Sequence, residues 1–325
     1  MGLFDNLIEA FLKLTDPTPR FTPERCLRER YAVGSCQICY ETCPHEAISL
    51  EHYTVEVDDT RCTGCGLCTG ACPGVALEFP LGPLQEALDK GRGRVRCSRA
   101  EGGGEEVYCL GRLTPGLLAD AATKHGRLVL AHGECARCPI GGAEVPERLQ
   151  AMAAEARRYA PGLELELIQG RLPERPVARR ELFSALLTGT RRTAATLLPE
   201  VPPQAVGAPE ELPSELRLRR AAARRGAEGV RWPRIEVEAG CTLCPVCANV
   251  CPTGAVRRET VGEEVVLSLA LEACTGCGAC VRSCPPQVIR VREASAAEVR
   301  AGTVELFRGA PLGHDPLAGL EEGNA

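Results

Sequence analysis

The feature that most constrains this chain is a run of four cysteines that occurs three times with one spacing. In each copy three cysteines stand two residues apart, and a fourth follows after three more residues, with proline directly behind it. The copies span Cys62–Pro73, Cys241–Pro252 and Cys274–Pro285. Such a run predicts a tight loop whose three leading thiols converge on one point, so the chain must fold around groups of sulfur atoms.

A fourth copy of the run lacks one member. It keeps Cys36, Cys39 and Cys43, but Val33 stands where the first cysteine is expected. Cys26 is the spare thiol nearest to this copy. We therefore predict that Cys26 supplies the missing ligand on a longer loop. The alternative is a three-ligand site with a free coordination position, suited to a three-iron cluster or a substrate-binding iron.

The spacing favours iron–sulfur clusters over disulfides and zinc. The chain has 20 cysteines, but disulfide frameworks belong to secreted proteins, and residues 1–15 do not have the pattern of a signal peptide. Paired C-x2-C motifs also bind zinc, whereas the triple spacing with a trailing Cys-Pro is a run that ligates iron–sulfur clusters. Gly64, Gly66, Gly276 and Gly278 allow the sharp turns that bring backbone N–H groups close to sulfur.

Residues 235–293 resemble two-cluster bacterial ferredoxins throughout, and residues 23–82 resemble them apart from the change at Val33. The resemblance implies a ferredoxin-like fold, two [4Fe-4S] clusters per unit and a role in electron transfer. In that family the fourth cysteine of a run ligates the other cluster. The implied ligand sets are Cys241, Cys244, Cys247 and Cys284; Cys251, Cys274, Cys277 and Cys280; Cys43, Cys62, Cys65 and Cys68; and, with our prediction for Cys26, Cys26, Cys36, Cys39 and Cys72.

Residues 91–170 alternate between strand and helix patterns, which predicts a small α/β domain. We expect helices over 113–125 and 147–159 and strands over 127–131 and 163–168, with short strands or loops at 94–97 and 106–109. Four cysteines fall at the expected strand ends, where ligands gather on open α/β sheets. A zinc site or plain thiols are the alternatives to a fifth cluster here. The four cysteines are Cys97, Cys109, Cys135 and Cys138.

The stretches 107–115 and 128–138 resemble the cluster domain of the delta subunit of methyl-viologen-reducing hydrogenase. That family passes electrons to heterodisulfide-reductase-type enzymes. The cysteine spacing is also similar to that of thioredoxin-like two-iron ferredoxins. Both resemblances imply one cluster on the four middle cysteines and favour two irons, so we expect [2Fe-2S] or [4Fe-4S] there.

Three other segments surround these units. Residues 1–22 predict an amphipathic helix that packs on its own domain or docks on a partner or membrane surface. Residues 171–234 hold 13 arginines against 7 glutamates and predict a basic linker of two helices with a Pro-rich connector. It either docks an acidic redox partner or covers the protein's own acidic groups. Residues 294–325 predict a helix and a frayed tail, and we interpret all five histidines as structural.

The whole chain is therefore expected to be an α+β protein in which two dicluster units flank an α/β cluster domain. We predict a polyferredoxin, with no catalytic residues of its own, that relays electrons as a subunit of a larger oxidoreductase in the cytoplasm. Its partners would be redox proteins or a catalytic subunit. A self-contained reductase and a redox sensor are the alternatives. The net charge of −5 argues against nucleic acid as a partner, and no stretch is apolar for long enough to span a membrane.

Overall fold

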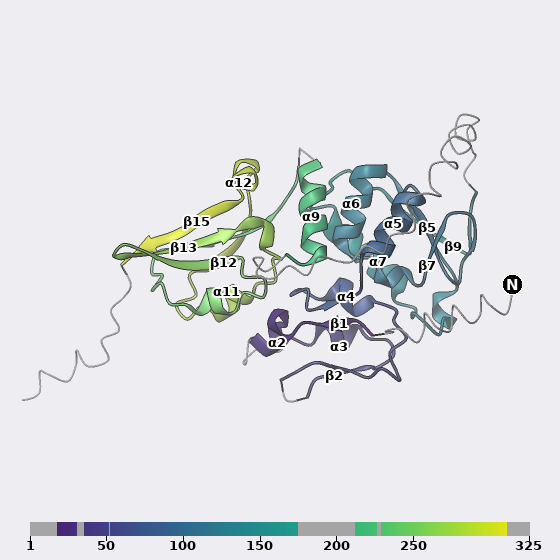
Figure 1. Ribbon diagram of the computed structural model, residues 1–325, viewed down its shortest axis with the longest axis horizontal. Helices are drawn as coiled ribbons and strands as arrows, with labels where there is room; N and C mark the ends of the chain where they lie inside the picture. The colour runs from purple at the N-terminus through teal and green to yellow at the C-terminus, as the bar shows by residue number, and fades with distance from the viewer. Residues whose placement is uncertain (1–17, 31–35, 52, 175–211, 226–228, 311–325) are drawn as a thin grey trace, which may run out of the picture.

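The protein forms three units in the computed structural model, which describes residues 18–30, 36–51, 53–174, 212–225 and 229–310. In Figure 1 the C-terminal unit lies at one end and the middle domain at the other, and the N-terminal unit lies beneath them. The predicted helices at 1–22 and 179–198 fall wholly or mostly outside the described residues, as does most of the Pro-rich connector. No helix in the described ranges is long and apolar enough to cross a membrane.

The N-terminal unit is built from very short elements because its loops follow the cysteine runs. A short hairpin links the two runs, in which β2 (Ile48–Ser49) pairs antiparallel with β3 (Glu56–Val57). Each run passes into a single helical turn, α3 (Ile38–Thr42) and α4 (Leu67–Ala71). The remaining elements are β1 (Arg20–Phe21), η1 (Pro23–Arg25), α2 (Leu27–Arg30) and β4 (Leu77–Glu78), and β1 pairs with β4.

The middle domain is the predicted α/β unit, built on a parallel sheet with the strand order β7-β5-β8-β9. Its central strand β8 (Leu128–His132) is buried along its whole length. The Thr114 hydroxyl accepts a bond from Leu117 N at 3.3 Å, and Pro115 fits the first turn, so α6 begins there. The other elements are α5 (Gly82–Lys90), β5 (Arg94–Cys97), β7 (Glu105–Val107), η2 (Leu110–Arg112), α6 (Pro115–His125), η3 (Cys135–Arg137), α7 (Val145–Ala156) and β9 (Leu165–Gln169), with a small pair β6 (Glu101–Gly102) and β10 (Arg171–Leu172).

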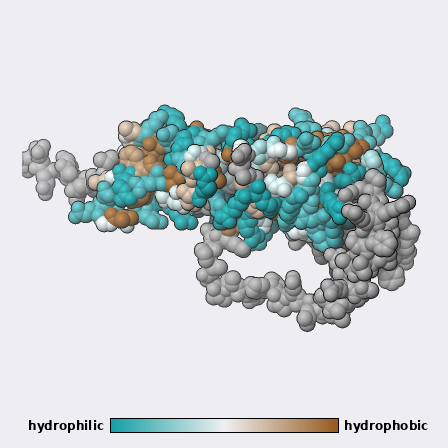
Figure 2. Space-filling view, turned by 90° about the horizontal axis from the view of Figure 1, so that it is seen from above, coloured by the Kyte–Doolittle hydropathy of each residue, from teal (hydrophilic) through white to brown (hydrophobic). Residues whose placement is uncertain are grey.

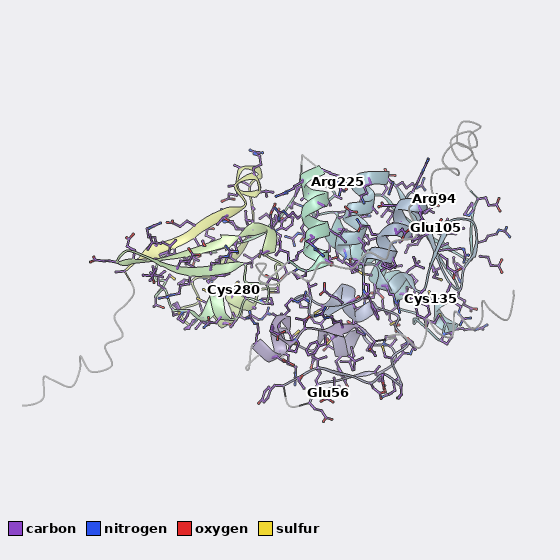
Figure 3. All side chains as sticks on the ribbon, in the orientation of Figure 1. Glu56, Arg94, Glu105, Cys135, Arg225 and Cys280 are labelled. Atoms are coloured by element: carbon purple, nitrogen blue, oxygen red, sulfur yellow. The ribbon has the colours of Figure 1, made fainter. Side chains whose placement is uncertain are left out.

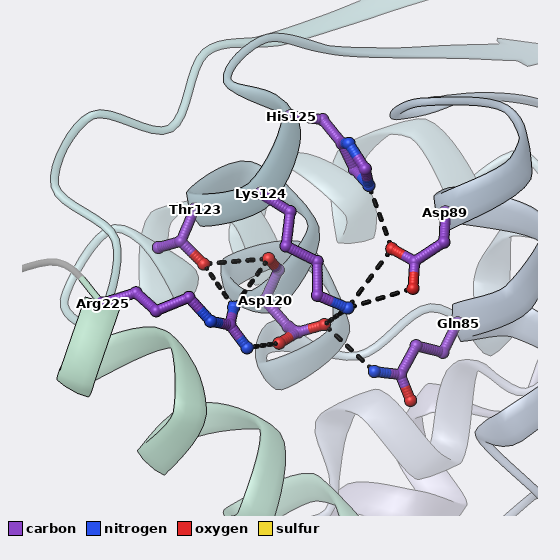
Figure 4. A network of polar contacts seen from close by, with 7 residues as sticks. All are labelled: Gln85, Asp89, Asp120, Thr123, Lys124, His125 and Arg225. Carbon is purple, nitrogen blue, oxygen red and sulfur yellow. Dashed lines mark hydrogen bonds and ion pairs between the residues drawn. The ribbon is translucent and has the colours of Figure 1, made fainter.

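Two helices outside the predicted range 91–170 pack on this domain. α5 precedes it, and α9 (Ser214–Arg225) comes from the predicted basic linker and packs along α6. The buried carboxylate of Asp120 ties all three helices together, because it accepts bonds from Arg225 at 2.6 Å, Lys124 at 2.8 Å and Gln85 at 3.2 Å (Figure 4). The described part of the basic segment thus covers acidic groups of this same chain.

A buried ion pair holds α9 in place. Glu215 Oε1 accepts bonds from Arg219 Nε and from Gly116 N, both at 2.7 Å. Replacing Glu215 with Ala leaves the buried Arg219 without its closest carboxylate, so we expect the free energy of unfolding to fall by about 3–5 kcal/mol.

Urea-induced unfolding measures this loss, and Glu166→Ala is the matched control. Glu166 pairs with Arg127 at the surface, where such a pair contributes only about 0–1 kcal/mol. Equal unfolding midpoints for the two variants would show that the buried pair does not anchor α9.

In the C-terminal unit the first strand, β11 (Pro233–Val237), pairs antiparallel with β14 (Ile289–Glu293), which follows the second cysteine run. Between the two runs, β12 (Val256–Val261) and β13 (Glu264–Ala270) form a hairpin. The expected frayed tail differs from the structure, because residues Thr303–Gly309 form β15 and pair with β13. The helical elements are α10 (Val246–Asn249), η4 (Leu271–Ala273), α11 (Ala279–Ser283) and α12 (Ala296–Ala301).

The surface seen in Figure 2 is mainly hydrophilic, and its apolar side chains occur in small separate groups. The three units are joined by specific contacts. Trp232, just before β11, is buried and packs edge-on against Tyr159 of the middle domain, with the ring centroids 4.9 Å apart. Arg224 of α9 donates to Glu272 of the C-terminal unit at 3.0 Å. Both contacts join the middle domain to the C-terminal unit, and the N-terminal unit contacts both of them through residues near its cysteines.

Candidate iron–sulfur sites

The second cysteine group of the C-terminal unit surrounds a cavity. Gly276 and Gly278 have φ values of +73° and +71°, a left-handed conformation that glycine adopts without strain. These turns curve the loop that carries Cys274, Cys277 and Cys280 around the cavity. The fourth cysteine, Cys251, comes from the end of the preceding run. The cavity encloses about 430 Å³ including its mouth. Its lining includes Cys251, Cys274, Cys277 and Cys280, which is the second predicted ligand set.

The first group of this unit also agrees with the predicted crossing. Burial raises the pKa of Cys247 to about 11, and the neighbouring thiols of Cys244, Cys241 and Cys284 act in the same direction. Cys284 closes the run 274–285, yet it lies beside the cysteines of the other run. Leu243 N donates to the sulfur of Cys241 at 3.4 Å, an interaction that would stabilise negative charge on that thiolate.

In the N-terminal unit, the intact run forms a second cavity with a cysteine from the incomplete copy. The lining includes Cys43, Cys62, Cys65 and Cys68, as predicted. Ala47 N donates to the Cys43 sulfur at 3.3 Å. The loop takes left-handed turns at Gly64 and Gly66, with φ values of +69° and +84°.

The structure brings the spare thiol Cys26 to the incomplete copy. Cys26 is buried in a small apolar cluster that Cys39 and Cys72 contact. Burial raises the pKa of Cys39 to about 12, and the charges of Cys72, Cys36 and Cys26 act in the same direction. Four thiols are therefore neighbours, of which the two runs supply Cys36, Cys39 and Cys72 and the upstream segment supplies Cys26. The role of Cys26 as a ligand stays a prediction.

The four middle cysteines, far apart in sequence, also meet. Cys97, Cys109, Cys135 and Cys138 line one cavity next to the end of the parallel sheet. Backbone N–H groups of Gly133 and Gly111 donate to the sulfurs of Cys97 and Cys109, each at 3.4 Å. Cys97 is the last residue of β5. The ends of the predicted strands therefore indicated where cysteines of this group would lie.

Two histidines lie at these cavities, which the interpretation of all histidines as structural did not anticipate. His132 lines the middle cavity, and its Nδ1 is 3.5 Å from the Cys135 sulfur. His45 lines the cavity of the intact N-terminal run. The sequence signal for His45 was its position directly after the Cys43-Pro44 pair, and that for His132 was its position directly before Gly133. Each position places the histidine close to a cysteine.

The donor sets fit iron–sulfur clusters. Each of the five places holds four thiols, and four of the five have a backbone N–H aimed at a sulfur. Within the described ranges, no three His, Cys, Asp or Glu side chains converge closely enough to hold a single metal ion. A cluster does not require such convergence, because each thiolate binds a separate iron at a separate corner.

The middle cavity and the Cys43 cavity adjoin each other. Ile140, two residues after Cys138, accepts a bond from Thr63 Oγ1 at 2.6 Å, and its carbonyl oxygen lies 2.9 Å from His45 Nε2. The Tyr108 hydroxyl donates to Thr63 O at 3.1 Å. Two cysteine loops from different units therefore share one hydrogen-bonded junction.

A second junction joins the N-terminal and C-terminal units. Leu27, Val250 and Ala279 form a small apolar cluster, and Cys36 and Cys277 pack against it from opposite units. Arg30, at the end of α2, donates to the carbonyl oxygen of Cys251. The cysteine group around Cys26 is therefore next to the group around Cys274.

Comparison with known proteins agrees with this geometry. Residues 34–76 and residues 240–289 each match a family described as a 4Fe-4S dicluster domain. A 44-residue stretch is 42% identical to a component of the ion-translocating oxidoreductase complex of Methanosarcina acetivorans, and covers 14% of this chain and 17% of that protein. A 61-residue stretch is 39% identical to the putative electron transport protein YsaA of Escherichia coli, and covers 18% of this chain and 39% of that protein.

Two segments of the chain are therefore similar to 4Fe-4S dicluster domains, one in the N-terminal unit and one in the C-terminal unit. The matched stretches span well under half the length of either relative. No solved structure matched the chain.

Proposed function

We propose that the protein binds five clusters and conducts electrons along them in a single line. The line would begin at the middle cysteines and pass through the sets around Cys43, Cys26 and Cys274, in that order. It would end at the set around Cys241. When bound, the clusters supply one-electron redox chemistry, and the chain's own residues fix their order and spacing.

The shared junctions support this order. Thr63 and Tyr108 join the first two sets, and the apolar cluster around Leu27 joins the third and fourth. Within each unit, the two sets are adjacent because each run contributes its fourth cysteine to the neighbouring set. Figure 3 shows Cys135 and Cys280 in separate units at opposite sides of the N-terminal unit.

The two ends of the line are suited to receive or release electrons. Cys135 and Cys138 are partly exposed at one end, and Cys241 and Cys244 at the other. The exposed loop residue Arg137 lies between the first pair. We propose that redox partners approach these ends, and that the protein serves as the relay subunit of a larger oxidoreductase in the cytoplasm.

We also propose that the middle set holds one [2Fe-2S] or [4Fe-4S] cluster, in keeping with its likeness to the delta subunit of methyl-viologen-reducing hydrogenase. The observation in favour is the shared cavity lined by all four cysteines. The other four sets would hold [4Fe-4S] clusters.

An electron count tests the proposed function. The protein, prepared without air and fully reduced with dithionite, is freed of reductant and mixed with an oxidised one-electron dye. We expect about five electrons per chain, one from each cluster, and about four from Cys97→Ala. Release of four or fewer electrons by the wild-type protein would rule out a five-cluster relay.

A further inference from the structure

Arg112 is half-buried at the junction of the two cysteine groups, and it has an unusual environment for a charged side chain. Its guanidinium carbon lies 4.2 Å from the centre of the Phe79 ring and 4.7 Å from the centre of the Tyr108 ring. Its Nε donates to Gly64 O at 2.7 Å. No carboxylate forms an ion pair with Arg112 in the part of the chain that the structure describes.

Cysteine sulfurs of two different sets are among the groups whose charge acts on Arg112. Cys62 and Cys65 belong to the intact N-terminal run, and Cys109 belongs to the middle set. Burial lowers the pKa of Arg112, while Tyr108 and these three thiols act in the opposite direction. A guanidinium stays charged even so, so the junction keeps a fixed positive charge.

Such a position has an electrostatic consequence. A positive charge held in a partly dry site interacts with nearby charge far more strongly than it would in water. Reduction makes a cluster more negative by one charge, so a neighbouring cation favours the reduced form. A cation beside two clusters favours the reduced form of both.

We propose that Arg112 is a positioning residue whose half-buried charge raises the reduction potentials of the middle cluster and of the cluster on Cys43, Cys62, Cys65 and Cys68 together. This inference rests on the proposed five-cluster function. The first electron transfer in the line would then occur between two clusters whose reduction potentials are raised together by one shared cation.

The test is an EPR-monitored redox titration of the loaded protein and of Arg112→Gln and Arg112→Met. In both neutral variants we expect the two junction clusters to become harder to reduce. The expected change is about tenfold in each reduction equilibrium, which is about 59 mV for one electron. The other three clusters should keep their potentials, and Arg112→Lys should retain most of the wild-type values.

A control variant separates charge from structure. Arg127→Gln removes an exposed arginine that is paired with Glu166, and all five potentials should stay unchanged.

The proposal is overturned if the neutral variants leave either junction potential unchanged, or if they shift all five potentials alike. It is also overturned if neither neutral variant assembles the two clusters while Arg112→Lys does, since Arg112 would then serve assembly. Five signals in the wild-type protein with no shift in Arg112→Gln would refute this inference alone. Fewer than five signals in the wild-type protein would refute the proposed function.

Discussion

Replacing Cys26 with Ala is expected to remove one [4Fe-4S] cluster and to interrupt the electron path in its middle. Iron content should fall from roughly 20 to roughly 16 atoms per chain if all five clusters are cubanes. The cluster lost would be the third in the line, which lies beside the Leu27 junction and connects the first two clusters to the C-terminal pair. The rate of electron tunnelling falls exponentially with distance. Electrons placed on the cluster of the middle domain should therefore reach the two C-terminal clusters orders of magnitude more slowly.

Thr42→Ala is the matched control for this variant. Thr42 is a buried residue of the same unit and contributes no sulfur, so its replacement should leave the iron content unchanged. Iron and sulfide analysis with freeze-quench EPR measures both effects. An unchanged iron count in Cys26→Ala would refute the ligand assignment and favour the three-ligand site near Cys36.

Replacing Gly66 with Ala should break the contact between the N-terminal unit and the middle domain. A Cβ atom at Gly66 would lie 2.7 Å from Cα and 2.9 Å from N of Arg112, so backbone would have to move. The left-handed conformation of Gly66, at φ +84°, adds about 1–2 kcal/mol of strain for any other residue. We expect a total loss of about 3 kcal/mol or more in stability.

Gly302→Ala separates the strain from the steric contact. Gly302 has a φ of +75° and a ψ of −34°, near the values of +84° and 1° at Gly66, and a Cβ atom there would meet nothing within 4 Å. It should cost only about 1–2 kcal/mol. The midpoint of thermal unfolding of both variants is measured by the loss of visible cluster absorbance on heating. Equal midpoints would mean that the junction at Arg112 tolerates movement.

The cysteine groupings could be predicted from the sequence because cluster ligation depends mainly on local spacing. Three thiols at two-residue gaps occupy one loop whatever the rest of the chain does. The fourth ligand follows from the ferredoxin resemblance, and the structure groups Cys284 with Cys241 and Cys251 with Cys274 accordingly. The position of Cys26 beside the incomplete copy could also be predicted, because it is the spare thiol nearest to that copy in the sequence.

The order of the groups could not be predicted, since it depends on side-chain contacts between distant segments. Nothing in the spacing links Thr63 to Ile140, or Cys36 to Cys277. Strand β15 was missed for a different reason. The alternation of Val304 and Leu306 with polar residues is weak, and the strand is stabilised by pairing with β13 and by packing on the core. Helix α5 was also missed, although Leu84, Ala87 and Leu88 have helical spacing and are buried.

The most direct test of the five-cluster relay is anaerobic iron and sulfide analysis combined with an EPR redox titration of the intact protein. A fully loaded chain should contain roughly 20 irons, or roughly 18 if the middle cluster has two irons, and should show five separate reduction steps. Roughly 16 irons with four steps and zinc on the middle cysteines would contradict the relay, and a colourless protein without iron would contradict every cluster assigned to it.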